Sequence, residues 1–449
     1  MRYPANYPRL RPSFLCLSVV AGVVIAAGAQ LHPGYNYDEK NVHAYTLPDP
    51  LRLANGKPVR KPATWFKQRR PEILRRFEEN VYGRTPAQAR VPLRFAVEEG
   101  DTPAFKGAAI RRQVTIYLTP KGEAGPKMHL LIYLPAQAVN PAPVILGLNF
   151  QGNQTVSADP GIILHEGWLR NPPRASPNQA NTPVTYARGM PGESSRGRQS
   201  QEWQAEEIVH RGYGLATAYY GDIEPDFADG MKDGIRPFFF KKGQSEPAPG
   251  EWGAIGAWAW GLSRALDYLL TERRIDGRRI AVTGHSRLGK TADWAAAQDT
   301  RFAALLSTES GKGGQSLYRR NLGENIAHLV DPYGYWFCRN FRQWVGRDSE
   351  IPVDGNLLLA LIAPRPLYVA SAEDDRWSDP RGEFLSAVDA GRVYQLLGKQ
   401  GLGTDSMPAV DHAVMHTVAY HVRSGKHDVT AFDWRQYLDF LDSQWGTPR

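Results

Sequence analysis

The chain has 449 residues, of which 42% are hydrophobic and 11% aromatic, so it can bury a large core and is not of the disordered class. Its formal net charge of +8 is mildly basic, and the sequence contains no block of about five or six like charges. We therefore expect no nucleic-acid partner.

The N-terminal residues, 1–29, have the pattern of a secretory signal peptide. Basic residues come first, an apolar stretch runs from Phe14 to Ala27, and Ala27 and Ala29 supply small residues before a cleavage site. The alternative is a retained transmembrane anchor, but the apolar stretch is shorter than the roughly 20 residues that a spanning helix needs. We expect a secreted or periplasmic protein that has no membrane attachment after cleavage.

The mature chain is predicted to contain one cysteine, Cys338, because Cys16 lies within the signal peptide. An intramolecular disulfide is then impossible, and packing alone must hold the core together. Cys338 lies in the aromatic stretch "YGYWFCRNF", which favours a buried structural thiol over a nucleophile.

The first half of the mature chain is expected to wrap the surface and then to enter a sheet. Residues 30–63 are rich in Pro and Asn, and residues 71–83 carry apolar positions at helical spacing behind a Pro suited to a first turn. Extended segments follow, the last of them continuous apolar runs typical of strands buried on both faces. These segments are 92–99, 111–120, 128–135 and 143–150. The pattern then lapses, and we expect an irregular insert near residues 151–203.

Helices and strands alternate in the second half of the chain. Helical patterns at 206–212, 254–273 and 288–299 are each followed by an apolar stretch rich in strand-forming residues. Such alternation predicts a mostly parallel central sheet with helices on both faces, a three-layer α/β sandwich. We expect residues 30–449 to form a single domain, with ligands bound where loops leave the carboxyl ends of the strands.

One of these strand-to-helix corners, "AVTGHSRLGKTADW" at residues 281–294, has the context of a nucleophile elbow. Ser286 stands between the strand and the helix, Gly284 allows a tight turn, and Gly289 allows the helix and the strand to approach closely. The second glycine comes one residue later than in the common G-x-S-x-G. The pattern is therefore compatible with either a catalytic serine or a structural helix cap.

A catalytic serine needs a base, and in α/β-hydrolase order the base follows the last strand. His427 meets this condition, since it lies in the loop 425–428 between a predicted strand and an amphipathic helix. His412, His416 and His421 lie in or before that strand, where packed or surface roles are expected. They have no companion motif for zinc, so we expect no metal site.

Two carboxylates compete to orient the base, and an arginine adjoins the serine. Glu309 follows the strand after the serine's helix, and Asp375 follows a later strand, so either can reach the imidazole or serve a structural role. Arg287 directly follows Ser286, where its guanidinium is expected to stabilise an oxyanion alongside a backbone donor. The segment 147–153 is a candidate for a second backbone donor.

Four segments together resemble the bacterial glucuronoyl esterases, family fifteen of the carbohydrate esterases. They read "GHSRLGK", "STESGKGG", "LLLALIAPRPLYVASAEDDRWSDPRGEF" and "SGKHDVTAFDW", and the resemblance spans roughly residues 35–445. It implies an α/β-hydrolase-fold serine esterase that cleaves esters of 4-O-methyl-glucuronic acid carried on glucuronoxylan, including bonds to lignin alcohols.

The resemblance also implies roles for individual residues. The catalytic positions fall on Ser286, His427, the oxyanion-stabilising Arg287, the usual acid Glu309, and Asp375, the aspartate that some bacterial members use or add. The sugar-binding positions fall on Lys290, Glu324 and Trp377. Lys290 lies one helical turn beyond Ser286, where it can bond sugar oxygens, and Trp377 can stack on a sugar face.

We therefore expect a monomeric serine esterase whose partner is a glucuronoxylan or lignin–carbohydrate ester and which needs no cofactor or metal. Two alternatives remain open at this point. One is another carbohydrate esterase, such as an acetyl xylan esterase. The other is a carbohydrate-binding protein that has the hydrolase fold but no catalytic activity.

Overall fold

The computed structural model describes residues 32–138, 140–170, 186–189 and 191–448. The predicted signal peptide and the centre of the predicted insert lie outside these residues. The described helices are α1 (Pro62–Thr64), α2 (Arg70–Phe77), α3 (Ser200–Trp203), α4 (Ala205–His210), α5 (Ala254–Leu269), α6 (Arg287–Gln298), α7 (Ile326–Tyr333), α8 (Gly355–Ala360), α9 (Pro380–Leu396) and α10 (Ala431–Trp445). The described strands are β1 (Arg94–Ala104), β2 (Ala109–Tyr117), β3 (Lys127–Pro135), β4 (Ala142–Asn149), β5 (Gly167–Arg170), β6 (Tyr186–Gly189), β7 (Gly214–Tyr219), β8 (Ile275–His285), β9 (Ala304–Thr308), β10 (Leu367–Ala372), β11 (His412–Met415) and β12 (Val418–Arg423).

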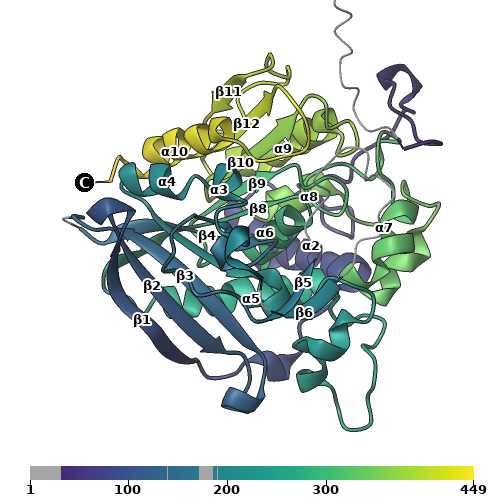
Figure 1. Ribbon diagram of the computed structural model, residues 1–449. Helices are drawn as coiled ribbons and strands as arrows, with labels where there is room; N and C mark the ends of the chain where they lie inside the picture. Colours follow the sequence, from purple (N-terminus) through teal and green to yellow (C-terminus); the bar gives the residue numbers. More distant parts are fainter. Residues whose placement is uncertain (1–31, 139, 171–185, 190, 449) are drawn as a thin grey trace, which may run out of the picture.

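A ten-stranded sheet runs through the molecule in the order β1-β2-β3-β7-β4-β8-β9-β10-β12-β11 (Figure 1). Six neighbouring strands of this sheet are parallel to one another, which confirms the predicted mostly parallel sheet. They are β7, β4, β8, β9, β10 and β12. The extended segments predicted between residues 92 and 135 form the antiparallel edge of this sheet. Short links join them, and a short link can return the chain only in the antiparallel sense.

Helices cover both faces of this sheet, and successive residues of its strands point to opposite layers. In β4, Val144 and Leu146 pack into the core cluster that contains the buried residues of α5 and α6. Ile145, between them, packs into the other cluster, with residues of α4 and α10. The continuous apolar runs of the sequence are therefore strands buried on both sides, and the fold is the expected three-layer α/β-hydrolase sandwich.

The predicted insert begins after β4 and is irregular where it is described. Its strands β5 and β6 pair with each other as a separate antiparallel sheet, while residues 171–185 and 190 are not described. That residues 30–449 form a single domain stays a prediction.

Cys338 is buried, as predicted from its aromatic surroundings, and its Sγ lies 3.9 Å from the carbonyl oxygen of Glu79. Burial raises the pKa of this thiol to about 11. Since the thiolate is the reactive form, Cys338 is a structural residue.

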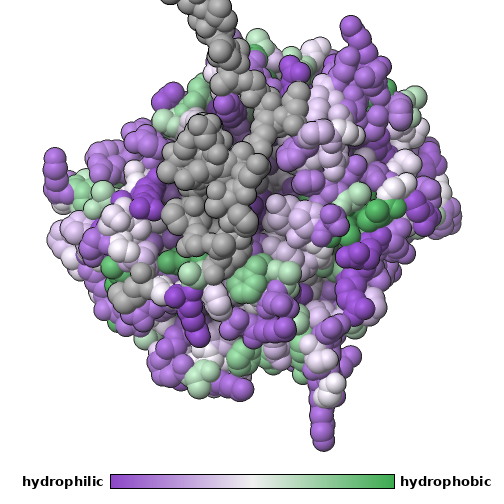
Figure 2. Space-filling view, turned by 45° about the vertical axis from the view of Figure 1, so that its right-hand side comes forward, coloured by the Kyte–Doolittle hydropathy of each residue, from purple (hydrophilic) through white to green (hydrophobic). Residues whose placement is uncertain are grey.

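The surface seen in Figure 2 is mainly hydrophilic, with hydrophobic residues in small separate groups. Within the described ranges, no helix combines the length and the apolar character that a membrane span requires.

The parallel strands β8, β9, β10 and β12 end at the same edge of the sheet. Ser286 and Glu309 directly follow β8 and β9, and Asp375 and His427 lie in the loops that follow β10 and β12. The fold thus brings to one edge four side chains that lie as much as 141 positions apart in the sequence.

Candidate active site

Ser286 occupies a strained turn between β8 and α6, with φ 57° and ψ −128°. Its side chain makes no capping hydrogen bond to the helix, so the helix-cap interpretation is wrong. Both neighbouring glycines are required by close packing. A Cβ at Gly284 would lie 2.0 Å from the carbonyl oxygen of Leu288, and one at Gly289 would lie 2.9 Å from the Cβ of Ser310. This geometry is that of a nucleophile elbow, although the glycine spacing is unusual.

A cavity of about 450 Å³ opens above this turn, and we refer to it as the Ser286 cavity. The eight site residues predicted from the sequence all line it: Ser286, Arg287, Lys290, Glu309, Glu324, Asp375, Trp377 and His427. Sequence reasoning missed other lining residues, among them His32, Tyr37, His328 and Trp336. Aromatic residues without a motif carried no signal that could have placed them here.

Both candidate acids reach the imidazole of His427. Its Nδ1 lies 2.7 Å from Oδ2 of Asp375 and 3.0 Å from Oε2 of Glu309, and both carboxylates are buried. Partial desolvation lowers the pKa of His427, whose side chain stays 39% exposed, but the charge and hydrogen bond of Asp375, followed by those of Glu309, outweigh it and raise this pKa well above its usual value. Burial raises the pKa of Asp375, but the adjacent His427 holds it below its usual range. The arrangement thus stabilises a protonated imidazole.

The two carboxylates differ in their other partners. Oε1 of Glu309 accepts a hydrogen bond of 2.9 Å from Nη2 of the buried Arg423, and Oε2 accepts one of 3.0 Å from the backbone N–H of Asp428. Oδ1 of Asp375 accepts from the backbone N–H of Ser378 at 3.3 Å, a contact with a neutral group. A cation therefore compensates the charge of Glu309, while the cationic partner of Asp375 is the imidazole itself.

Arg287 lies between two aromatic rings, with its guanidinium carbon 5.3 Å from the ring centre of Phe150 and 5.1 Å from that of Trp336. Its Nη1 lies 3.5 Å from Oδ2 of the buried Asp226. Hydrogen bonds of 2.6–2.8 Å fix this carboxylate, and they come from Tyr220, Tyr335 and Trp336. Stacking and the ion pair together hold the guanidinium at the mouth of the elbow.

The segment 147–153 contributes Phe150 to this arrangement, and its role as a second backbone donor stays a prediction.

The predicted sugar contacts also line the Ser286 cavity. Nζ of the buried Lys290 donates to the carbonyl oxygen of Ser310 and lies 3.4 Å from Oε1 of Glu324. Trp377 packs against His32 and His328, with ring centres 4.2 and 4.4 Å apart. A buried cation, a carboxylate and an aromatic group suit a ligand with several hydroxyl groups and an apolar ring face.

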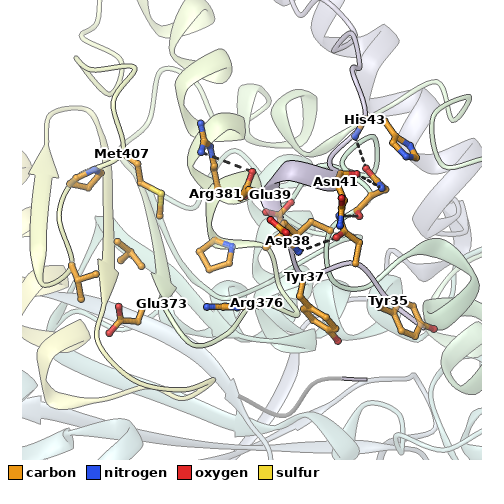
Figure 3. A pocket seen from close by; sticks show the side chains of 18 of the residues that line it. Tyr35, Tyr37, Asp38, Glu39, Asn41, His43, Glu373, Arg376, Arg381 and Met407 are labelled. Carbon is orange, nitrogen blue, oxygen red and sulfur yellow. Dashed lines mark hydrogen bonds and ion pairs between the residues drawn. The ribbon is translucent and has the colours of Figure 1, made fainter. Parts of the chain in front are cut away.

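The N-terminal segment, residues 32–43, also borders the Ser286 cavity, through His32 and Tyr37. Asn36 and Asn321 tie it to the loop that carries Glu324, through hydrogen bonds of 2.9 Å. A second depression of about 1220 Å³, which we call the outer hollow, lies beside this segment (Figure 3). Tyr37 and Arg376 line both the outer hollow and the Ser286 cavity, so the two spaces are neighbours.

The remaining histidines take the positions expected of them. His421 is buried and bonds Asp433 and Tyr368, and His412 is exposed at the start of β11. Within the described part of the chain, His285, Glu309 and His427 bring donor atoms within 4.8 Å of one another, as a metal site requires. Nδ1 of His427 and Oε2 of Glu309 are already paired, however, so a cation would have to displace this contact.

Comparisons with known proteins agree with this geometry. A family model described as glucuronyl esterase of fungi matches residues 246–398. A carbohydrate esterase from an unknown prokaryotic organism is 45% identical over 409 residues, which cover 91% of this chain and 92% of the relative. A 4-O-methyl-glucuronoyl methylesterase from Podospora anserina is 40% identical over 179 residues, 38% of this chain and 36% of the relative. The solved structure of a glucuronoyl esterase from Solibacter usitatus is 50% identical, with a TM-score of 0.84, and the match covers 91% of this chain and 100% of that one.

Proposed function

The chain belongs to the glucuronoyl esterases of carbohydrate esterase family fifteen, and from this premise we propose a role for each residue of the Ser286 cavity. The enzyme is a carboxylic ester hydrolase that cleaves esters of glucuronic acid carried on xylan. We propose that Ser286 is the nucleophile, His427 the base, Asp375 the acid that orients the base, and Arg287 the cation that stabilises the oxyanion.

The reaction begins when Nε2 of His427 takes the proton of Ser286 and Oγ attacks the ester carbonyl carbon of the uronate. The negative charge that develops on the carbonyl oxygen is stabilised by Arg287 and by backbone N–H groups at the start of α6. The imidazolium then protonates the leaving alcohol. Water, activated by the same imidazole, releases the uronate from Ser286.

The observation that carries this proposal is the convergence of all eight residues on one cavity, with Asp375 and His427 in contact at 2.7 Å. These residues come from helix α6, from the segments that follow β8, β9, β10 and β12, and from the loop before α7, and the fold gathers a nucleophile, a base, an acid and a cation there. That the enzyme is a monomer stays a prediction.

We propose that Lys290 and Glu324 bond hydroxyl or ring oxygens of the uronate and that Trp377 packs on its ring. The outer hollow offers room for the part of a polymeric substrate that lies beyond the uronate, either xylan or a lignin alcohol. The predicted signal peptide and the extracellular nature of the substrate polymer support export from the cell.

Side-by-side kinetics on three esters test the substrate class. We expect kcat/KM to be highest for the methyl ester of glucuronate. The galacturonate ester, whose 4-hydroxyl is inverted, should lose about tenfold for each hydrogen bond that the inversion breaks. Acetylated xylose should react least, because it cannot place a uronate on Lys290 and Glu324. A strong preference for the acetyl ester would instead assign the chain to acetyl xylan deacetylation.

A conservative change at Asp226 tests the oxyanion assignment without touching the cation itself. Asp226→Asn keeps the size of the side chain but removes the charge that pairs with Arg287. We expect kcat to fall by about tenfold, less than the 10²- to 10³-fold loss typical of deleting an oxyanion donor, with KM nearly unchanged. Steady-state kinetics beside Arg287→Ala check this order. A larger rise in KM than fall in kcat would place Arg287 in ground-state binding.

A further inference from the structure

Arg423, the last residue of β12, is buried, and its guanidinium donates hydrogen bonds to several acceptors. Its Nε donates to Oδ2 of Asp433 at 3.0 Å, and its Nη2 donates to Oε1 of Glu309 at 2.9 Å. Further bonds of 2.5–3.0 Å reach the backbone carbonyls of Ser424, Lys426 and Asp428. One guanidinium therefore bonds two carboxylates and three peptide groups.

The three peptide groups belong to the loop that carries His427. Arg423 reaches the carbonyls on both sides of His427, at Lys426 and Asp428, so the guanidinium fixes the loop at the two peptides that flank the imidazole. Asp433, its other partner, caps α10 through Thr430, and this anchors the far end of the same loop. The position of the imidazole relative to Ser286 thus depends on a side chain that does not line the Ser286 cavity.

The charge of Arg423 also changes what Glu309 can do. A buried carboxylate without a cation is strongly destabilising, and Arg423 supplies a permanent cation to Glu309, whose other oxygen also lies 3.3 Å from Nε2 of His285. Glu309 then uses its second oxygen to accept the N–H of Asp428, which ties the loop to the end of β9. Two carboxylates can therefore lie beside one imidazole, because Arg423 already compensates the negative charge of Glu309.

We propose that Arg423 is a positioning residue that neutralises Glu309 and fastens the His427 loop, so that Glu309 serves mainly as a brace while Asp375 carries the larger part of the charge that assists the imidazole. This inference rests on the proposed function of the Ser286 cavity. The charged and titratable groups around His427 that bear on it are Asp375, Glu309, His285, Lys426, Asp428 and Arg423 itself.

The test is the pH profile of kcat/KM for the methyl ester of glucuronate, measured on the intact mature enzyme. In Arg423→Met the charge of Glu309 loses its cation, and the imidazolium becomes the cation nearest to it. The acid limb of the profile, where His427 loses its proton, should move to higher pH by about one unit. Adding Glu309→Gln to Arg423→Met should return the limb to lower pH, because the uncompensated charge is gone.

Two further variants separate charge from fold. Arg423→Lys keeps the positive charge but loses the five N–H donors of the guanidinium. We therefore expect a wild-type acid limb with a lower kcat. This variant still tests the role of the charge if Arg423→Met does not fold. Arg69→Met is a matched control, because Arg69 is equally buried and pairs with Glu72 and with backbone carbonyls away from the Ser286 cavity. It should lower Tm without moving the limb.

An acid limb that is unmoved in folded Arg423→Met, or displaced in Arg423→Lys, would overturn the positioning role. So would a displacement that Glu309→Gln does not reverse. If the wild-type enzyme hydrolyses the uronate ester, any of these results would leave the proposed function intact. If the wild-type enzyme does not hydrolyse this ester, the proposed function itself is wrong.

Discussion

Replacing Ser286 by alanine is expected to lower kcat for the methyl ester of glucuronate by about 10⁵- to 10⁶-fold, the loss found when a serine nucleophile is deleted. The reason is that the acyl-enzyme cannot form, while Arg287 and the backbone donors still act on the carbonyl. Alanine is no worse suited than serine to the positive φ of the elbow, so the fold should be unaffected. Steady-state kinetics with a coupled alcohol assay measure the loss.

Ser386→Ala is a suitable control, because Ser386 is a buried serine of α9 that does not line the Ser286 cavity. It should retain wild-type kcat. Calorimetric titration of Ser286→Ala with glucuronamide should show binding as tight as that of the wild type. Retained hydrolysis in Ser286→Ala, with binding unchanged, would show that another residue is the nucleophile.

Replacing Asp375 by asparagine is expected to lower kcat by about 10⁴-fold, because the amide can donate to Nδ1 and so favour the wrong tautomer of His427. The change also removes the largest contribution that raises the pKa of His427. A group with a raised pKa loses its proton at higher pH, so the acid limb of kcat/KM should move to lower pH in this variant. A pH series of single-turnover or steady-state rates measures both effects.

Glu309→Gln is the matched comparison, since the same imidazole nitrogen lies 3.0 Å from this second acid. We expect a loss of about tenfold, the loss of one buried hydrogen bond, because Arg423 already compensates the charge of Glu309. A larger loss for Glu309→Gln than for Asp375→Asn would reverse the assignment. Equal mild losses would mean that the two acids share the role.

Much of the site could be predicted because each candidate follows the end of a predicted strand. In a parallel sheet these ends share one edge, so Ser286, Glu309, Asp375 and His427 had to meet once the strands were assigned correctly. The elbow was also predictable, since Gly284 and Gly289 are the residues that close packing requires there.

The sequence could not decide between Glu309 and Asp375. Both lie at the correct edge, and the difference between them is a hydrogen bond to Arg423, a residue 114 positions from Glu309 within an apparently ordinary strand. Asp226 was missed for the same reason, because its role depends on a contact with Arg287 across the fold. Such charge pairing is a property of tertiary contacts, and no local pattern indicates it.

The aromatic residues of the N-terminal segment that border the Ser286 cavity were missed for a different reason. His32 and Tyr37 lie in a segment without apolar periodicity, which was predicted only to wrap the surface. It does so, but the loop it meets is the one that carries Glu324, and the rings therefore border the Ser286 cavity. A surface path predicted from composition gives no information on which part of the surface the chain crosses.

The central claim is that a single activated serine lies in a cavity shaped for glucuronate. Labelling with a fluorophosphonate tests it most directly, because this reagent reacts with activated serines. Peptide mapping identifies the labelled residue, and one arm of the experiment contains glucuronamide, an amide isostere of the ester. The account predicts one adduct, on Ser286, that forms more slowly with glucuronamide and is absent from His427→Ala. An adduct on another residue, or labelling of Ser286 that glucuronamide does not slow, would contradict it.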